Sequence, residues 1–372
     1  MKICIWGNVG EALKGNTEGG GELQMALIAK ALAKAGNDVV IIDFSIPEDF
    51  ITSDGIRVLK INGWNEGIRI IRTFTHRLPN LYRSLKNQNA DVYYCRIRDS
   101  RQILAYWAAR TIKAKFILGL ASDLDALGFM KRLKYDYLVK VRDLWWFFNG
   151  ILTEIVYPFL VRKSDLVIVQ HEGQKKMIQN KCIKSELFAN FINIDKIVVP
   201  ANVTQKDFIF VGWLDKRKGF VELYELIKKS PNHAFKIIGP PRDKTGHFYY
   251  EKLKSFKNVS LLGKLSHSET LIHIANSKAL ISTSPMEGFP NVFIEAWACG
   301  IPVLSLYVDP GNVIEHEELG GIANGNIDSL IKMMGQIKNT HEFSTKAKTY
   351  VIRNHAFNAT RIAELDKLFK EL

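Results

Sequence analysis

Residues 207–219, with the sequence DFIFVGWLDKRKG, contain the pattern that decides the fold. They begin with a short run of apolar and aromatic residues at 207–211, which is typical of a buried β-strand. A glycine and a basic turn at 216–218 follow, and then a helical pattern over Val221–Lys229. A strand that leads through such a turn into a helix begins a βαβ unit, so the stretch predicts a parallel sheet covered by helices.

The same alternation of short apolar runs and helical patterns occurs along the chain in two series. The first series of predicted strands is Lys2–Trp6, Asp38–Phe44, Asp91–Tyr94, Lys115–Leu118 and Asp165–Val169, and the second is Asp207–Val211, Ala234–Ile238, Val259–Leu262, Ala279–Ser282 and Pro302–Ser305. The sequence therefore predicts an α/β protein with two doubly wound, Rossmann-like parallel-sheet lobes.

The boundary between the lobes is expected between the two series. The chain has 372 residues, and at about 150 residues per domain this length suggests two domains. Asn193–Gln205 contains a proline and lacks a periodic apolar face, which favours a linker there. The predicted domains are 1–196 and 197–354, with a C-terminal helix at 355–372 that crosses back to the first lobe. A ligand is expected in the cleft between the lobes.

The amino-acid composition is that of a globular protein from a reducing compartment. Apolar residues make up 47% and charged residues 24%, as in ordinary globular proteins. The four cysteines are far apart in the sequence, which predicts neither a zinc site nor a disulfide framework and favours a reducing compartment. The apolar run at the N-terminus is too short for a signal peptide, so we expect a cytoplasmic protein.

The chain is strongly basic, and its positive charge is unevenly distributed along the sequence. The net charge is +13, and residues 60–163 hold 19 Lys/Arg against 8 Asp/Glu, which places +11 in about a quarter of the chain. A region of this kind attracts anionic lipid head groups, acidic glycans or nucleic acid.

A glycine-rich loop precedes the first long helical pattern. Gly20 and Gly21 lie just before an amphipathic stretch at 23–34. Glycines at a helix start let backbone N–H groups approach a phosphate, although a flexible turn is an equally good interpretation of a single such loop. The fingerprint G-x-G-x-x-G is absent, which argues against a dehydrogenase.

The basic turn after the strand at 207–211 is the second candidate site. Lys216, Arg217 and Lys218 stand side by side before a helix start. Arginine binds phosphate oxygens in a planar, bidentate way and lysine acts as a point charge, so the turn is suited to a diphosphate. A charge run alone is usually a solvated loop, but a position after the first strand of a lobe favours a ligand site.

The most specific motif is PMEGFPNVFIEAWACGIP at residues 285–302. Pro290 is expected near a helix start, so that Glu287 precedes the helix and Glu295 lies within it. Two carboxylates at different depths can accept hydrogen bonds from different hydroxyls of one ligand, while the N–H groups around Asn291 and Val292 meet its phosphates.

Three motifs in chain order resemble those of the family 4 retaining glycosyltransferases, which have the GT-B fold of two Rossmann-like lobes facing a central cleft. The motifs are Gly20–Gly21, the Arg217–Gly219 turn, and the E-x7-E pair of Glu287 and Glu295. The resemblance covers nearly the whole chain. It implies that the first lobe binds an acceptor and that the second lobe binds a nucleotide-sugar donor.

The resemblance also implies roles for individual residues. Arg217 and Lys218 bind the donor diphosphate and stabilise the leaving group, while Glu287 contacts the donor sugar and Glu295 the ribose hydroxyls. The other implied donor-binding residues are Gly20, Gly21, Gly212, Lys216, Gly239, Leu265, Gly288, Phe289, Pro290, Asn291 and Val292. The implied reaction retains the anomeric configuration and requires no metal ion and no cofactor.

The chain departs from the family pattern at two places. Trp213 stands where members usually carry an arginine, so one phosphate contact is missing or is supplied by Lys216. A histidine that members often carry after the fifth strand of the first lobe is also absent. Ser122 or Asp123 is expected in its place, with Asp123 in a catalytic role and Ser122 at the acceptor. The same Asp123-Leu124-Asp125 is a D-x-D triplet, with which the other large glycosyltransferase fold holds a metal ion and a donor diphosphate, so that fold is a rival interpretation.

Arginines after the predicted strand at 91–94 are candidates for holding an anionic acceptor. Arg96 and Arg98, with Arg101 close by, follow the carboxyl end of that strand, where open parallel sheets bind ligands. Exposed arginines at a helix start are an equally good interpretation. His171, His267 and His273 lack metal-ligand spacing and are interpreted as structural or solvent-facing.

Residues 131–163 combine cations with the aromatic run Trp145–Phe148. The apolar stretch is interrupted by Asn149, Glu154 and Pro158, which argues against a spanning helix. The pattern favours a helix that lies in the head-group region, so we expect peripheral attachment to the inner face of the cytoplasmic membrane. The alternative is that these aromatic residues pack in the core of the first lobe.

The resemblance thus implies a retaining, metal-independent hexosyl- or N-acetylhexosaminyl-transferase. The expected donor is a nucleotide-diphosphate sugar with UDP as the nucleotide, and the expected acceptor is lipid-linked or a polysaccharide, as in lipopolysaccharide, O-antigen or capsule synthesis. A nucleotide-sugar epimerase of the same fold is the enzyme alternative, and a basic nucleic-acid-binding protein is the alternative without catalysis.

Overall fold

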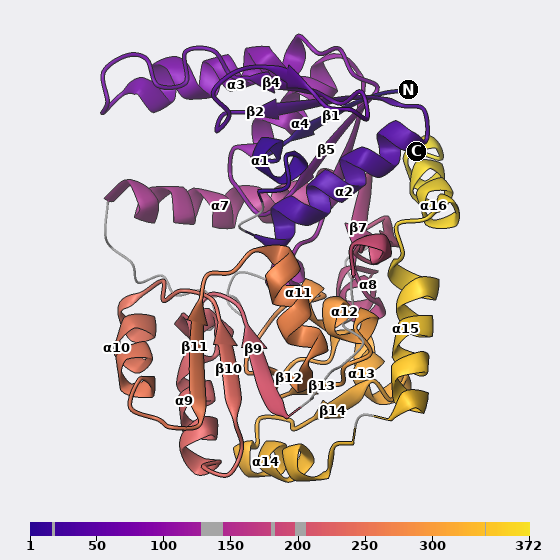
Figure 1. Cartoon of the computed structure of the whole chain (residues 1–372). Helices are drawn as coiled ribbons and strands as arrows, with labels where there is room; N and C mark the ends of the chain where they lie inside the picture. Colours follow the sequence, from indigo (N-terminus) through magenta and orange to yellow (C-terminus); the bar gives the residue numbers. More distant parts are fainter. Residues whose placement is uncertain (17–18, 128–143, 180–182, 198–205, 339) are drawn as a thin grey trace. The chain divides into compact units, whose positions relative to one another are not determined.

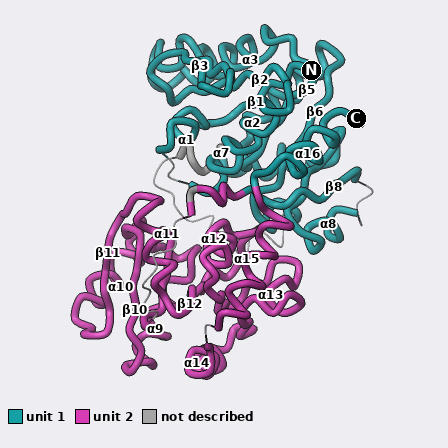
Figure 2. The backbone as a smooth tube through the Cα atoms, turned by 45° about the vertical axis from the view of Figure 1, so that its right-hand side comes forward, with its two compact units in different colours: residues 1–191, 357–372 teal, residues 192–356 magenta. Residues whose placement is uncertain are grey.

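A computed structural model describes the chain except residues 17–18, 128–143, 180–182, 198–205 and 339, and the side chains of 144–149 and of Lys196. The chain forms two compact units, shown in Figure 2: unit 1 is 1–191 with 357–372, and unit 2 is 192–356. The first crossing between units therefore follows Phe191, five residues before the predicted boundary, and the second follows Ala356.

Unit 1 is built on an eight-stranded sheet in the order β3-β4-β2-β1-β5-β6-β7-β8 (Figure 1). The strands are β1 (Lys2–Trp6), β2 (Asp38–Asp43), β3 (Phe50–Ile51), β4 (Arg57–Lys60), β5 (Val92–Arg96), β6 (Lys115–Gly119), β7 (Leu166–Val169) and β8 (Ser185–Leu187). Neighbouring strands are parallel except β3 and β4. The strand order reverses between β1 and β5, and ligands of such sheets bind at the carboxyl ends of strands beside this point.

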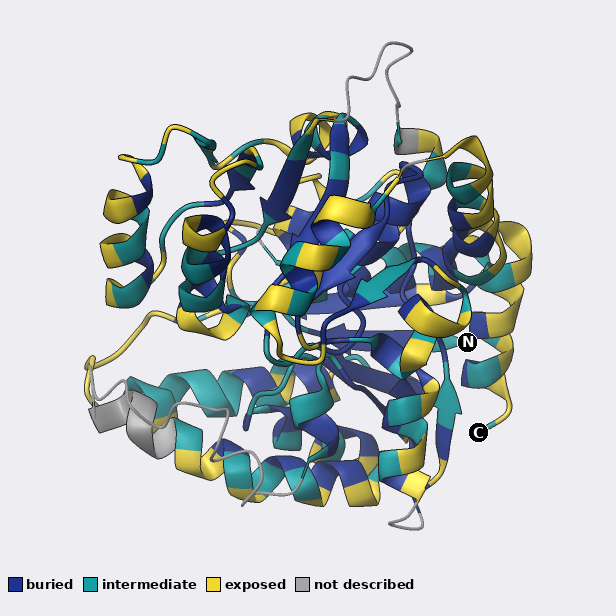
Figure 3. Ribbon diagram, turned by 90° about the horizontal axis from the view of Figure 1, so that it is seen from below, coloured by how far each residue is buried: buried dark blue, intermediate teal, exposed yellow. Residues whose placement is uncertain are grey.

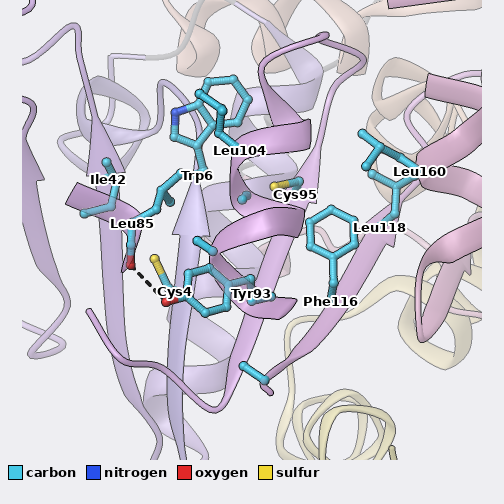
Figure 4. Close-up of a cluster of buried hydrophobic side chains, with 14 of the residues drawn as sticks. Cys4, Trp6, Ile42, Leu85, Tyr93, Cys95, Leu104, Phe116, Leu118 and Leu160 are labelled. Atoms are coloured by element: carbon cyan, nitrogen blue, oxygen red, sulfur yellow. Dashed lines mark hydrogen bonds between the residues drawn. The ribbon is translucent and has the colours of Figure 1, made fainter. Parts of the chain in front are cut away.

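Helices cover both faces of this sheet. They are α1 (Gly10–Leu13), α2 (Gly20–Lys34), the π-helical turn η1 (Thr73–Arg77), α3 (Leu78–Lys86), α4 (Gln102–Thr111), α5 (Asp123–Ala126), α7 (Leu144–Lys163), α8 (Glu172–Gln179) and α16 (Ala359–Lys370). Successive residues of a strand point to opposite faces, so Cys4 joins one hydrophobic cluster while Ile3 and Ile5 join another. Figure 4 shows the first cluster, in which the Tyr93 hydroxyl donates to the Leu85 carbonyl at 2.9 Å.

The last helix, α16, belongs to unit 1 although the chain reaches it from unit 2. Leu365 and Phe369 complete the second hydrophobic cluster, beside residues of α2. The Arg361 guanidinium donates to the Ala189 carbonyl at 2.9 Å and lies 4.2 Å from the centre of the Phe188 ring. The C-terminal helix is therefore a structural part of unit 1.

Unit 2 has a six-stranded parallel sheet in the order β11-β10-β9-β12-β13-β14. The strands are β9 (Asp207–Val211), β10 (Phe235–Ile238), β11 (Val259–Gly263), β12 (Ser277–Ser282), β13 (Val303–Ser305) and β14 (Gly320–Ile322). The helices are η2 (Ile194–Lys196), η3 (Lys216–Lys218), α9 (Phe220–Lys229), α10 (Lys244–Leu253), α11 (His267–Ala275), α12 (Asn291–Ala298), η4 (Pro310–Asn312), α13 (Val313–His316), α14 (Ile327–Gln336) and α15 (His341–His355). The strand order here reverses between β9 and β12.

The predicted fold class is confirmed. All ten predicted strands are present within two residues of their predicted ends. Each unit has a sheet between helices, mainly parallel in unit 1 and parallel in unit 2, and the strands are among the most buried segments in Figure 3. The C-terminal helix predicted at 355–372 is α16, which begins at Ala359, after the chain has passed from unit 2 back to unit 1.

Three cysteines are buried in these cores, namely Cys4, Cys95 and Cys299. Burial raises the pKa of all three thiols, and that of Cys299 to about 12. We therefore expect these residues in the native protein to react with iodoacetamide at pH 8 far more slowly than in the denatured chain, because the thiolate is the nucleophile. Mass spectrometry of native and denatured samples measures this difference, and rapid labelling of native Cys299 would contradict it.

Candidate functional site

The basic turn of unit 2 is held in place by a buried carboxylate. Asp215 is 2% exposed, and its Oδ1 accepts a hydrogen bond from the Lys218 backbone N–H at 3.1 Å. Its Oδ2 accepts from the Arg217 guanidinium at 2.9 Å. An aspartate that caps the start of a helical turn satisfies N–H groups that have no intrahelical partner. The three cations at 216–218 thus stand on a fixed turn at the carboxyl end of β9.

Gly219 ends this turn and allows it to approach the neighbouring strand. Its φ is +67°, and a Cβ atom there would lie 1.9 Å from the Thr283 carbonyl oxygen. The Thr283 hydroxyl donates to the Lys218 carbonyl at 3.0 Å. Thr283 directly follows β12, so the turn after β9 is fastened to the carboxyl end of β12, at the reversal of strand order.

This proximity brings the two strongest sequence motifs together. The Lys218 Nζ lies 2.5 Å from the Glu287 Oε1, although the residues are 69 positions apart in the chain. Helix α12 begins at Asn291 with Pro290 as its N-cap residue, so Glu287 precedes the helix and Glu295 lies within it, as the sequence predicts. The lysine and the acid therefore form one charged pair at the sheet edge.

Glu295 is buried in α12, with 8% of its surface exposed. Its Oε1 lies 2.9 Å from the Nε2 of His267, the first residue of α11, whose side chain is 52% exposed. The sequence interpretation of His267 as structural or solvent-facing missed this contact. Nothing in the spacing indicates it, because α11 and α12 are separate elements that meet only through the packing of unit 2.

The remaining predicted donor-binding residues line the same part of unit 2. Gly212 and Gly239 follow β9 and β10, and a Cβ atom at Gly239 would lie 1.9 Å from the Gly212 carbonyl oxygen. Leu265 packs on the hydrophobic cluster that includes Phe289, which contacts the rings of Trp297 and His355. Gly288 and Pro290 flank Phe289, and Asn291 and Val292 form the first turn of α12.

Trp213, which replaces the usual arginine, has a cation as its neighbour. The Arg242 guanidinium lies 5.0 Å from the centre of the Trp213 ring. The Arg242 backbone N–H donates to the Leu214 carbonyl at 3.1 Å, and the Asp243 carboxylate accepts from the Lys216 backbone N–H at 3.4 Å. The loop after β10 thus places the positive charge of Arg242 beside the turn after β9, where the usual arginine is absent. The sequence offered Lys216 as the substitute and did not identify Arg242.

In unit 1, Gly20 and Gly21 form the first turn of α2. A Cβ atom at Gly21 would lie 2.9 Å from the side chain of Ile97, which follows β5. Gln24 fixes this end of the helix, because its amide exchanges hydrogen bonds of 2.8 Å with the backbone of Phe191. The glycines therefore lie beside the reversal of strand order between β1 and β5.

The two acids of the D-x-D triplet in unit 1, Asp123 and Asp125, take part in two separate hydrogen-bond networks. Asp123 accepts from Gln174 and contacts the ring of the buried His171, each at 2.9 Å. Asp125 forms a capping box with Ser122 at the start of α5. Within the described part of the chain, no group of three or more His, Cys, Asp or Glu side chains is arranged to hold a metal ion. The contact of His171 with Asp123 was not predicted.

The predicted acceptor arginines are paired inside unit 1. Arg96 is 4% exposed and donates to the Asn190 side chain at 2.8 Å. Arg98 forms an ion pair with Glu154 of α7. Neither residue is thus an exposed cation at a helix start, and a contact with an acceptor stays a prediction for both.

The prediction of a membrane-surface helix rests on the basic and aromatic segment at 131–149, most of which lies outside the described residues. Residues 131–143 and the side chains of 144–149 lie outside the described residues, while α7 is a helix that contains Pro158. Among the described helices, none combines the length and the apolar character that a membrane crossing requires.

Comparison with known proteins finds similarity to glycosyltransferases. Residues 192–356, which are unit 2, match the family described as glycosyl transferases group 1. The chain is 26% identical over 212 residues to an uncharacterized glycosyltransferase of Haemophilus influenzae, across 52% of this chain and 57% of that protein.

A second relative has a described activity. The chain is 26% identical over 240 residues to the N-acetylgalactosamine-N,N'-diacetylbacillosaminyl-diphospho-undecaprenol 4-alpha-N-acetylgalactosaminyltransferase of Campylobacter jejuni, across 58% of this chain and 62% of that protein. The chain spans about half the length of the curated relatives it matches.

Among solved structures, Anabaena HepE in complex with UDP and glucose superimposes with a TM-score of 0.69 and 15% identity, over 100% of this chain and 98% of that one. This likeness concerns the fold. Residues 192–356 are thus similar to the glycosyl transferases group 1, and the two parallel-sheet units have the fold of the GT-B glycosyltransferases.

Proposed function

We propose that the protein is a retaining glycosyltransferase whose donor is a nucleotide-diphosphate sugar with UDP as the nucleotide. The observation that carries the proposal is the pair of Lys218 and Glu287 at the strand reversal of unit 2, 2.5 Å apart, in a group 1 domain. A cation and an acid at one sheet edge can bind the two parts of such a donor, the diphosphate and the sugar. The UDP complex of the HepE structure, which shares the fold, supports the choice of nucleotide.

The proposed chemistry is electrostatic. The bond between the anomeric carbon and the diphosphate oxygen breaks, and Lys218 and Arg217 stabilise the negative charge on the leaving diphosphate. The acceptor oxygen bonds to the same carbon, and its proton passes to the leaving diphosphate. In this scheme Glu287 holds hydroxyls of the donor sugar and Glu295 those of the ribose. The cations of the chain neutralise the diphosphate, so we propose that no metal ion and no cofactor takes part.

For the acceptor we propose a lipid-linked or polysaccharide glycan in surface-glycan synthesis, of the lipopolysaccharide, O-antigen or capsule kind. The relative from Campylobacter jejuni acts, by its name, on a diphospho-undecaprenol acceptor. Residues 60–163 hold the excess of positive charge, which favours contact of unit 1 with an anionic surface. We therefore place the protein in the cytoplasm, peripherally attached to the inner face of the cytoplasmic membrane.

The donor proposal is tested by a screen of UDP-, GDP- and ADP-sugars, with and without EDTA. Thermal stabilisation and sugar turnover are measured for the native protein, Glu295→Ala and Lys218→Ala. Lys229→Ala is the control, because this exposed lysine pairs with Asp328 on another surface of unit 2. Stabilisation by UDP-sugars that survives EDTA and weakens only in the two site variants is expected. Loss of stabilisation in EDTA, or conversion of the sugar without transfer, would contradict the proposal.

Removal of the imidazole at His267 should weaken nucleotide binding by about tenfold or more, because one hydrogen bond to a charged group is worth about 1.5 kcal/mol or more. His267→Ala leaves the buried Glu295 without this contact and free to turn from the ribose. His273→Ala is the matched control on the same helix, because the carboxylate that acts on its ring is Glu269 and neither acid of the motif. Calorimetric titration with UDP measures the difference, and equal affinities of the two variants would disprove the role of His267.

A further inference from the structure

Unit 1 exposes a segment of large apolar side chains between arginines. Residues 68–72 have the sequence IRIIR, in which Ile68, Ile70 and Ile71 are 68%, 87% and 46% exposed. Single exposed apolar residues are common, but three in one short segment form a patch that marks an interaction site. No strand or helix of the described chain covers this patch, and it contains none of the residues proposed to bind the donor.

An apolar groove follows the segment. It has a volume of about 650 Å³ and lies between α3 and α4, with Phe74, Leu78, Tyr82, Leu104 and Trp107 among its lining residues and Arg110 at its border. The Trp107 side chain is 51% exposed. Tryptophan is enriched where a protein meets the boundary between lipid and water, because its ring is apolar and its N–H is polar.

The apolar surface continues from the groove to α7. The Arg110 guanidinium lies 4.9 Å from the centre of the Tyr106 ring, and Tyr106 makes an edge contact of 5.5 Å with Phe159 of α7. On the same helix Leu152, Ile155 and Phe159 are exposed. We call residues 68–74, the groove between α3 and α4, and the exposed side of α7 the apolar face of unit 1.

The side chains around this face carry an excess of positive charge, which favours an anionic partner. Residues 62–90 contain Arg69, Arg72, Arg77, Arg83 and Lys86 against the single acid Glu66. Within the described chain, Arg69 and Arg83 have no carboxylate partner, whereas Arg110 pairs with Asp165 at 2.9 Å. Two copies of such a face would repel each other, since both carry the same charge. Unpaired arginines beside exposed isoleucines fit an anionic lipid surface instead.

We infer that the apolar face of unit 1 docks on an anionic lipid bilayer. Ile68, Ile70 and Ile71 enter the head-group region, Arg69 and Arg72 contact lipid phosphates, and the groove accepts one hydrocarbon chain. The inference deepens the membrane contact of the proposed function by naming its surface. The inference rests on described residues of unit 1, and it does not depend on the donor chemistry of unit 2.

Vesicle flotation of the full chain tests the inference. The vesicles consist of phosphatidylcholine alone or of phosphatidylcholine with phosphatidylglycerol, at low and high salt. The variants are Ile68→Asp with Ile70→Asp for the apolar contact and Arg69→Gln with Arg72→Gln for the charge. Ile352→Asp is the matched control, an isoleucine of unit 2 that is 53% exposed. The melting temperature and the stabilisation by UDP are recorded for every variant.

We expect the native chain and Ile352→Asp to float with the anionic vesicles at low salt. The double aspartate variant should bind at least tenfold more weakly to both kinds of vesicle, and the double glutamine variant should lose its preference for phosphatidylglycerol. Melting temperature and UDP stabilisation should be unchanged in both, because these side chains are on the surface of unit 1.

Three outcomes would overturn the inference. Flotation of the double aspartate variant at the native level would place any membrane contact elsewhere in the chain. Absence of flotation by the native chain would remove both the proposed membrane contact and its surface, while UDP stabilisation would still decide the donor proposal by itself. A native dimer that the same aspartates convert to a monomer, with unchanged flotation, would identify a second copy of the chain as the occupant.

Discussion

Replacing Lys218 by alanine is expected to lower turnover of the nucleotide sugar by about 10² to 10³, with the fold retained. The amine lies 2.5 Å from Glu287 at the strand reversal of unit 2, and it is 34% exposed, so a diphosphate can reach it. Its removal leaves the leaving diphosphate without one positive charge and Glu287 without its partner. Steady-state release of the nucleotide diphosphate measures kcat and KM, and thermal unfolding reports on the fold.

Two further variants separate charge from position. Lys218→Arg keeps the charge with a different shape and should recover part of the turnover. If Lys218 acted only by holding Glu287 in place, then Glu287→Gln would cost as much as Lys218→Ala, and the double variant would cost no more. We expect a smaller effect of Glu287→Gln on kcat and a further loss in the double variant. A Lys218→Ala variant that kept more than a tenth of native turnover would contradict the electrostatic role.

The sheets of both units could be predicted from the sequence because each central strand is a short apolar run that ends at a turn. The strands that the sequence missed are β3, β4, β8 and β14, which lie at or near the sheet edges. They have two to four residues each, and β14 begins with two glycines. Such strands are defined by their neighbours in the sheet, and a local pattern of this length does not indicate them.

The candidate site was predicted in part for the same reason. Lys218 and Glu287 each lie in a local motif, and the parallel strand order brings the motifs together. The contacts of Glu295 with His267, of Trp213 with Arg242 and of Asp123 with His171 join separate elements through tertiary packing. A single histidine or arginine carries no spacing signal, so these partners become visible only in the folded chain.

For Arg96 the sequence predicted the position on the sheet but not the burial of the side chain. Its position at the end of β5 is where a parallel sheet binds ligands, and the sequence therefore made it a candidate for the acceptor. The side chain is nevertheless buried against Asn190, which comes from the segment after β8. The position of Arg96 at the end of a strand could thus be predicted. The burial of its side chain could not, because it depends on a residue almost a hundred positions away.

Gly219→Ala is expected to destabilise unit 2 by about 3 kcal/mol and to lower its melting temperature by several degrees. Two costs add. The residue has a φ of +67°, where a side chain is disfavoured by roughly 1 kcal/mol or more. The new Cβ atom would also lie 1.9 Å from the Thr283 carbonyl oxygen, which belongs to the backbone and cannot turn away. Calorimetric unfolding of the purified variant measures the loss.

Gly263→Ala separates the two costs. Gly263 has a φ of +69° in the same unit, but a Cβ atom there meets nothing within 4 Å, so this variant should lose only the conformational part of the stability. The difference between the variants reports the close approach of the basic turn to the end of β12. Because the same approach places Lys218 beside Glu287, Gly219→Ala should also weaken stabilisation by UDP. Equal melting temperatures of the two variants would mean that β12 yields to the new side chain, and that the basic turn is held by Asp215 alone.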